Sequence, residues 1–269
     1  MSVTKDTLIF TNQGIIPISL LNKFEDGVYS YDENINYDIL SDNIIQTKKL
    51  IQSNITSDII QIKTQNNYIL KGTENHKISI LRNGILEWKE LKNLQVNDLV
   101  RIQLNYNISN INDIISQSDI DKLLLEEIDY IEDIDRILES SKNIQKYFLQ
   151  HYFNKYMYLI DNTIQIINKN TNILKQLQML LLAFNICSRI DLNTLYIDSK
   201  YWNNFQNNIG IINEIKKIYL NNFIQSEYIQ DEYIFLAIEQ IDYIEPEITY
   251  TLELDNCDCY IGNGFMNQC

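Results

Sequence analysis

Four residues are the strongest candidates for a reaction that forms or breaks acyl bonds. Ser2 carries a hydroxyl and Cys269 a thiol, and each group can attack a carbonyl carbon. His76 ends the segment Gly72-Thr73-Glu74-Asn75-His76, and a pKa near neutrality suits histidine to proton transfer. Gln268 directly precedes Cys269, and a glutamine amide can attack its own backbone carbonyl to close a six-membered glutarimide. These four residues supply two nucleophiles, an acid–base group and a cyclising amide, and they come from the start, the first third and the end of the chain.

The composition argues against several kinds of site and partner. The 269 residues carry a formal net charge of −14, whereas a surface that holds a nucleic-acid backbone needs clustered Lys and Arg. The segment Cys257-Asp258-Cys259 has no second ligand pair at a useful spacing, so we expect no metal site. The crowding of cysteines at the C-terminal end is also unlike a disulfide framework. We expect no cofactor.

Nothing in the sequence indicates export or membrane insertion. The N-terminal residues lack a basic stretch followed by an apolar one, which a secretory signal would have. No apolar run approaches the roughly 20 residues that are needed to span a bilayer. We therefore expect a cytoplasmic location, which is a reducing compartment. We also expect a monomer.

The sequence around these residues divides into three segments. Residues 2–106 and 246–268 show the apolar–polar alternation of strands, whereas residues 107–245 contain acidic, helix-length segments. The order predicts one β domain in two pieces, interrupted by an inserted α/β domain, with Met1 and Cys269 as flanking residues.

Local patterns give specific elements within these segments. Residues 60–63 and 77–80 alternate as strands, and Asn83-Gly84 predicts a tight hairpin after the second of them. In the insert, residues 147–158 favour a helix and residues 163–166 a strand. A second helix is predicted by an apolar stripe at helical spacing, formed by Leu174, Leu177, Leu181 and Phe184.

The N-terminal residues 2–18 read SVTKDTLIFTNQGIIPI: a nucleophile, Thr7 five residues on, an apolar strand, a turn and an apolar-Pro-apolar run. This block resembles the N-terminal block of inteins, the protein-splicing elements of the Hint family. Residues 28–32 resemble the short strand that follows in inteins, and Thr73-Glu74-Asn75-His76 is similar to their T-x-x-H block. Residues 88–100 resemble the next strand segment, with Asn97 where glycine is usual; asparagine tolerates a positive φ better than most residues.

The C-terminal flank, residues 250–269, resembles the last two intein blocks with several departures. Thr251 stands where an aspartate is usual, and Asp258 stands where a histidine is usual. The terminal pair reads Asn267-Gln268 where His-Asn is usual. The segment before Cys269 is also about one residue short, which leaves open that Cys269 is an altered terminal residue.

The resemblance implies a fold and a reaction. The fold would be mainly β, a Hint-type horseshoe with pseudo-twofold symmetry that brings residues 2 and 268 together, interrupted by the α/β insert. The reaction would be autocatalytic protein splicing, a single-turnover process in which the element excises itself and ligates its two flanks. Those flanking segments of the host protein would be its partners.

The resemblance also implies a role for each site residue. Ser2 would receive the preceding acyl group in an N-to-O shift, Cys269 would take it over by transesterification, and cyclisation of Gln268 would release the joined flanks. His76 would protonate the departing nitrogen, helped by its neighbours. The remaining residues of the expected site are Thr73, Asn75, Asp258 and Asn267.

The insert resembles a homing endonuclease of the LAGLIDADG class. The similarity lies in residues 148–157 and in the apolar run that follows. That class needs a carboxylate at the end of its helix to hold a divalent metal, and Asn154-Lys155-Tyr156 supplies none. The sequence also holds one such helix where the class uses two. We expect a degenerate remnant that has lost nuclease activity and does not bind DNA.

Two other functions are compatible with parts of this pattern. One is a site-specific DNA endonuclease with the β part as its carrier. The other is a hedgehog-type autoprocessing domain, which cleaves the N-side junction and passes the acyl group to an external nucleophile. The pair Gln268-Cys269 favours splicing, because such a domain needs neither residue. Whether Ser2 is the natural residue or replaces the more usual cysteine is left open.

Overall fold

The computed structural model describes residues 1–11, 14–21, 38–40, 44–53, 56–104, 113–125, 134–223, 227–254 and 259–269. The chain divides into two compact units. The first contains Met1–Gln103 and Tyr233–Cys269, and the second contains Leu104–Glu232. The intein-like segment at residues 28–32 and the segment Cys257-Asp258 lie outside the described residues.

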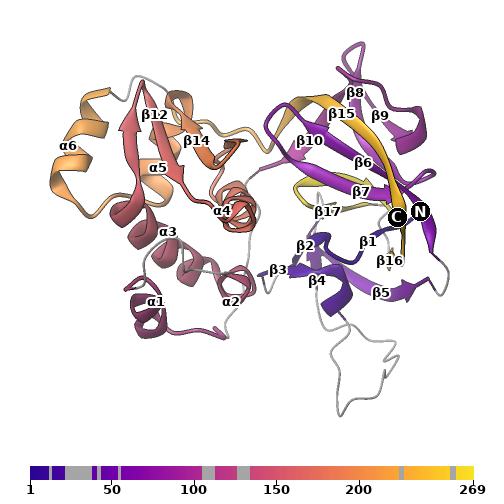
Figure 1. The fold of residues 1–269 in the computed structure, drawn as a ribbon, viewed down its shortest axis with the longest axis horizontal. Helices are drawn as coiled ribbons and strands as arrows, with labels where there is room; N and C mark the ends of the chain where they lie inside the picture. Colours follow the sequence, from indigo (N-terminus) through magenta and orange to yellow (C-terminus); the bar gives the residue numbers. More distant parts are fainter. Residues whose placement is uncertain are drawn as a thin grey trace. The chain divides into compact units, whose positions relative to one another are not determined.

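The first unit is a large antiparallel sheet built from both ends of the chain. Figure 1 shows its purple early strands beside its orange and yellow late strands. The early strands are β1 (Val3–Thr4), β2 (Leu8–Thr11), β3 (Gly14–Pro17), β4 (Asp38–Leu40), β5 (Ile44–Gln52), β6 (Ser57–Thr64), β7 (Ile69–Thr73), β8 (Lys77–Arg82), β9 (Ile85–Glu90) and β10 (Leu99–Gln103). The late strands are β15 (Tyr233–Glu247), β16 (Thr249–Leu254), β17 (Cys259–Gly262) and β18 (Phe265–Gln268). Short 3₁₀ turns lie at Ile18–Leu20 and Leu91–Asn93.

The sheet closes on itself through β10. From β10 the hydrogen-bonded order runs through β15, β6, β7, β1, β16, β5, β4, β2, β17 and β18 to β8, and β10 also pairs with β18 and β8. Each late strand therefore pairs with at least one early strand. β15 pairs with β10 and β6, and β16 pairs with β1 and β5. The mainly β fold class that the sequence predicts, with an α/β insert, is confirmed.

Two turns confirm specific sequence predictions. Asn83 and Gly84 have φ of 52° and 77° and join β8 to β9, whose register pairs Arg82 with Ile85. This is the left-handed pair of residues that a tight two-residue hairpin requires. Asn97, in the position where inteins usually have glycine, has a φ of 73°.

The boundary after the insert differs from the one predicted. Residues 233–245, expected in the insert, form most of β15 in the first unit. Many side chains of this strand are polar or exposed, and Leu236 and Ile238 are its buried positions. The segment therefore shares the acidic character of the insert, while its partners in β6 and β10 lie more than a hundred residues earlier in the sequence.

The second unit is the α/β segment. Its helices are α1 (Gln117–Leu123), α2 (Asp135–Leu138), α3 (Lys142–Tyr156), α4 (Thr171–Ala183), α5 (Trp202–Asn208) and α6 (Glu214–Phe223), with a 3₁₀ turn at Ser199–Tyr201. Its sheet has the order β11 (Tyr158–Ile160), β12 (Thr163–Ile167), β14 (Thr194–Asp198) and β13 (Arg189–Asp191). The predicted strand at 163–166 and both predicted helices are present. The apolar stripe on α4 is buried, as its spacing indicates.

No helix in the described part of the chain is both long enough and apolar enough to cross a membrane.

Candidate active site

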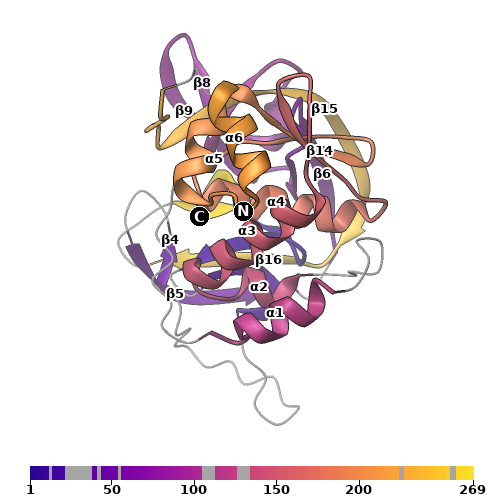
Figure 2. The same cartoon turned by 90° about the vertical axis from the view of Figure 1, so that its left-hand side faces the viewer.

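The two ends of the chain meet within the first unit. Both views place the N- and C-termini close together (Figures 1 and 2). The sheet explains this proximity: β1 pairs with β7 and β16, while β18 pairs with β8, the strand that follows β7. The β7–β8 turn, which carries Thr73, Asn75 and His76, therefore lies next to both ends.

Ser2 is held by backbone and side-chain contacts with Thr73. The backbone N–H of Thr73 donates to the Ser2 carbonyl at 2.9 Å, and the Ser2 N–H donates to the Thr73 hydroxyl oxygen at 3.2 Å. The Thr73 hydroxyl lies 2.8 Å from the Asn75 side-chain oxygen and 3.4 Å from the Ser2 carbonyl. A hydroxyl has one hydrogen to donate, and the shorter distance assigns it to Asn75. Thr73 thus accepts from the nitrogen of the Met1–Ser2 peptide bond.

The Ser2 hydroxyl has a partner from the other end of the chain. Its oxygen lies 2.7 Å from the hydroxyl oxygen of Thr251, 249 residues away. Thr251 is on β16, which pairs with β1 through Val3 and Tyr250. In the sequence, Thr251 stood out only as a departure from the usual aspartate. The block pattern therefore marked this position, but it did not predict the contact with the Ser2 hydroxyl.

His76 connects the N-terminal cluster to the C-terminal strand. The ring is fully buried, and its Nε2 lies 2.8 Å from the Asn267 side-chain oxygen. Asn267 is fully buried on β18, one residue before Gln268. The other ring nitrogen, Nδ1, is also buried and has no hydrogen-bond partner among the described residues.

Burial keeps this imidazole neutral. Desolvation lowers the pKa of His76 from 6.5 to about 4, although its hydrogen bond with Asn267 acts in the opposite direction. The positive charge of the N-terminal amino group adds a smaller lowering. At neutral pH the ring therefore has a lone pair on one nitrogen, which a general base requires.

Two glycines at this site allow neighbouring backbone and side-chain atoms to pack closely against one another. A Cβ at Gly72 would lie 3.0 Å from the Ser2 carbonyl oxygen and 3.2 Å from the His76 Cβ. A Cβ at Gly262, on β17, would lie 3.0 Å from the Asn267 amide nitrogen and 3.1 Å from a Thr7 methyl carbon. Larger residues would push these groups apart. Neither glycine was predicted as a site residue, and only their places beside the T-x-x-H block and the C-terminal turn could have indicated them.

The last two residues lie at the end of β18 and are partly exposed. Gln268 is opposite Cys259 in the register with β17. The Gln268 side-chain oxygen is buried and has no hydrogen-bond partner in the described structure. Burial raises the pKa of Tyr260 well above its usual value, and charge at Cys269 raises it further, which places Cys269 near that ring.

Of the predicted site residues, the structure thus brings Ser2, Thr73, Asn75, His76 and Asn267 into one hydrogen-bonded region, with Gln268 and Cys269 adjoining it. Asp258 lies outside the described residues. Nowhere in the described ranges do three or more His, Cys, Asp or Glu side chains gather in a way that could hold a metal ion.

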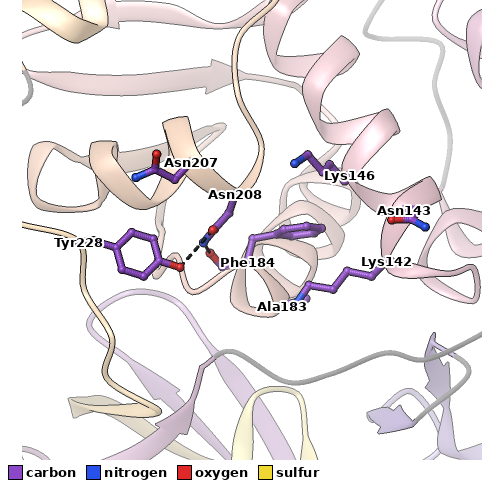
Figure 3. Close-up of a pocket in the computed structure, with 8 residues that line it drawn as sticks. All are labelled: Lys142, Asn143, Lys146, Ala183, Phe184, Asn207, Asn208 and Tyr228. Carbon is purple, nitrogen blue, oxygen red and sulfur yellow. Dashed lines mark hydrogen bonds between the residues drawn. The ribbon is translucent and has the colours of Figure 1, made fainter.

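The second unit has a separate hollow that contains none of the predicted site residues. Its lining is cationic and polar, with an aromatic side: Lys142, Asn143, Lys146, Ala183, Phe184, Asn207, Asn208 and Tyr228 (Figure 3). The Tyr228 hydroxyl donates to Asn208, whose amide donates to the Phe184 carbonyl. No carboxylate is among these lining residues, so the hollow does not provide the metal ligands that an endonuclease site needs.

Comparison with known sequences gives one partial match. No family model matches the chain. A segment of 110 residues, 40% of this chain, is 30% identical to reverse gyrase of Methanocaldococcus jannaschii. The match spans 7% of the length of that protein.

Comparison with solved structures gives similarities to inteins. An intein from a hyperthermophile is 10% identical, with a TM-score of 0.45 over 100% of this chain and 99% of the other. A DnaB intein from Synechocystis is 9% identical, with a TM-score of 0.43 over 100% and 97%. The TvoVMA intein is 11% identical, with a TM-score of 0.43 over 99% and 96%.

Proposed function

We propose that this chain is an intein, which excises itself from a host protein and joins the two flanking segments. One observation carries the proposal. A buried, neutral histidine lies between a nucleophilic serine at one end of the chain and a terminal Asn-Gln-Cys segment at the other. Its contact with Asn267 spans 191 residues of sequence. The block similarities of both flanks agree with this arrangement.

The first step is an N-to-O acyl shift at the Met1–Ser2 bond. The Ser2 oxygen attacks the Met1 carbonyl carbon and forms an ester, while the bond from that carbon to the Ser2 nitrogen breaks. The proton lost by the hydroxyl passes to His76 and from there to the departing nitrogen, so that the step is balanced. Thr73 orients that nitrogen through its 3.2 Å contact, and Thr251 orients the attacking oxygen through its 2.7 Å contact.

The second step transfers the acyl group to Cys269. The Cys269 sulfur attacks the ester carbonyl and forms a thioester, and the Ser2 oxygen leaves and regains a proton. Cyclisation of Gln268 follows: its side-chain nitrogen attacks its own backbone carbonyl, the bond from that carbonyl to the Cys269 nitrogen breaks, and the proton lost by the amide passes to the departing nitrogen. The amine so freed on Cys269 takes the acyl group from its own sulfur and forms a peptide bond between the flanks.

The two units have separate roles in this proposal. The splicing domain comprises the first unit, and the second is an inserted remnant of a LAGLIDADG-type endonuclease that does not bind DNA. The partners are the flanking segments of the host protein, and the element acts as a monomer because one chain holds both junctions. We expect it wherever the host protein is made, in the cytoplasm.

The test is splicing between two foreign carrier proteins, with the whole chain including Met1 and Cys269 between them. Mass spectrometry should detect the ligated carriers and the excised chain. Because a six-membered ring closes less readily than the five-membered ring from asparagine, we expect the branched intermediate joined at Cys269 to accumulate. Intact precursor as the sole species would overturn the proposal. Cleavage only at the N-side junction, and only with an added thiol, would instead support a hedgehog-type domain.

Variants at Gln268 test the release step. Gln268→Ala should abolish release of the joined carriers while branching continues. Gln268→Asn should speed release, because succinimide formation is easier. If Gln268→Ala releases the C-side carrier at the original rate, Gln268 is not the cyclising residue.

A further inference from the structure

The hydrogen bonds of Asn267 fix the direction in which its side-chain amide points. The Asn267 nitrogen donates to the Phe265 carbonyl at 2.7 Å and to the Gly262 carbonyl at 3.3 Å. Both partners are acceptors, so only the amide nitrogen can face them. The oxygen must therefore face His76. The reversed amide would set its oxygen against two carbonyl oxygens inside a buried site.

This orientation decides which nitrogen of His76 carries the proton. An amide oxygen only accepts hydrogen bonds, so the 2.8 Å contact requires a proton on His76 Nε2. A neutral imidazole has one ring proton, and Nδ1 is therefore the nitrogen with the lone pair. Nδ1 is the buried atom that has no partner among the described residues.

We propose that Asn267 is a positioning residue for the N-side step: it holds the His76 proton on Nε2 and thereby keeps Nδ1 as the base. This inference rests on the proposed splicing function. It also couples the two junctions, because Asn267 belongs to the C-terminal hairpin of β17 and β18. His76 acquires its reactive form only when that hairpin is in place. Acyl transfer at the N-side junction therefore awaits the docking of the C-side segment that must receive the acyl group.

The tautomer can be measured without any splicing activity. The sequence contains two histidines, so a ¹⁵N spectrum of the labelled chain at neutral pH shows two rings, and His151→Gln assigns them. His151 provides an internal reference. Its Nδ1 donates to the Tyr147 carbonyl at 2.9 Å, so that nitrogen carries a proton. We expect a hydrogen-bonded Nε2–H and an unprotonated Nδ1 for His76, and a protonated Nδ1 for His151.

Variants of Asn267 test its control of the ring. Asn267→Leu removes the acceptor and keeps the branched shape of the side chain, and the His76 Nε2–H signal should lose its hydrogen-bonded character. The matched control is Met266→Leu on the same strand, which should leave the signal unchanged. If Asn267→Leu does not fold, Asn267→Ala provides the same test with a smaller side chain. A protonated Nδ1 on His76 in the unmodified chain, or an unchanged signal in the folded variant, would overturn the inference.

A kinetic cycle distinguishes this role from a purely structural one. In the precursor, hydroxylamine cleavage of the ester reports the N-side step. Asn267→Leu should slow that step by about tenfold, the loss expected for one buried hydrogen bond. In a His76→Ala precursor the same change should have no further effect, because Asn267 acts through His76. If the rate of the N-side step in the double variant fell by the product of the two single-variant factors, the inference would be contradicted. No ester in the unmodified precursor would instead refute the proposed function, and the spectra would still test the tautomer.

Discussion

At the scale of single residues, the site depends on hydrogen bonds whose directions follow from the chemistry of their partners. Residue types and block patterns predicted Ser2, His76 and the terminal Asn267-Gln268-Cys269 segment as site residues. They could not predict that Thr251 contacts the Ser2 hydroxyl, since the two residues are 249 positions apart. Nor did they predict the contact between Asn267 and His76, because the similarity suggested a role for Asn267 at the C-side junction.

Thr251 should speed the N-side step by orienting the Ser2 hydroxyl. Thr251→Val keeps the shape of the side chain and removes the hydroxyl, so the acyl shift should slow by roughly five- to tenfold. Thr251→Ser keeps the hydroxyl and should remain within about twofold of the original rate. Hydroxylamine cleavage of the precursor gives both rates. Equal rates for the valine and serine variants would show that the 2.7 Å contact has no role in the reaction.

His76 should make the stability of the chain depend on pH. Its pKa is about 4 in the folded chain and 6.5 when unfolded, so between these values the unfolded state binds a proton that the folded state does not. The free energy of unfolding should therefore fall as the pH drops from about 6.5 to 4, by up to about 3 kcal/mol from this group. Urea unfolding of the original chain and of His76→Gln at several pH values isolates the contribution. If the free energy of unfolding changed equally with pH in both chains between about pH 4 and 6.5, the prediction would be wrong.

At the scale of elements, local sequence patterns predicted turns better than they predicted domain boundaries. The Asn83-Gly84 hairpin requires a left-handed backbone that few residue pairs favour, so the two residue types are enough to predict the turn. β15 has no comparable local signal. Its partners are distant strands, and several of its polar side chains face solvent, which made residues 233–245 look like part of the acidic insert.

The turn before β10 should depend on the left-handed conformation of Asn97. The N–H of Asn97 donates to the Ile238 carbonyl at 2.9 Å, which ties this turn to β15. Asn97→Gly should fold with unchanged or slightly higher stability. Asn97→Ala should lower the free energy of unfolding by about 1 kcal/mol, because a Cβ without a polar group is disfavoured at a φ of 73°. Urea unfolding measures both values, and an alanine variant as stable as the glycine variant would count against the assigned turn.

At the scale of the whole molecule, the insert interrupts the sheet at two points that lie side by side. Gln103 pairs with Tyr233 in the register of β10 and β15, and the Leu104 N–H donates to the Glu232 carbonyl at 2.6 Å. The chain thus leaves the sheet and returns to it at neighbouring positions. A long insert at such a place lowers the free energy of unfolding of the sheet only slightly, because the entropic cost of closing a loop grows slowly with its length.

The second unit should therefore be removable. Replacing residues 105–231 with a short Asn-Gly turn should leave a folded β unit, since β10 and β15 would then form an ordinary hairpin. Circular dichroism should show a mainly β spectrum with cooperative melting, and splicing between carrier proteins should persist. The control deletion removes residues 107–245, the boundaries suggested by the sequence. It eliminates most of β15 and should not fold. If the shorter deletion also fails to fold, the insert supports the sheet.

The residue types of the proposed reaction, the order of the blocks, the mainly β class and the tight turns could be predicted from the amino-acid sequence alone. These properties depend on side-chain chemistry and on backbone preferences within a few residues. Which side chains contact one another is a property of the folded chain. The tertiary structure alone brings Thr251 to Ser2 and Asn267 to His76, and it alone gives a fully buried imidazole whose pKa falls to about 4. Burial and hydrogen-bond direction arise from strands that are distant in the sequence and adjacent in the sheet, and no local pattern specifies them.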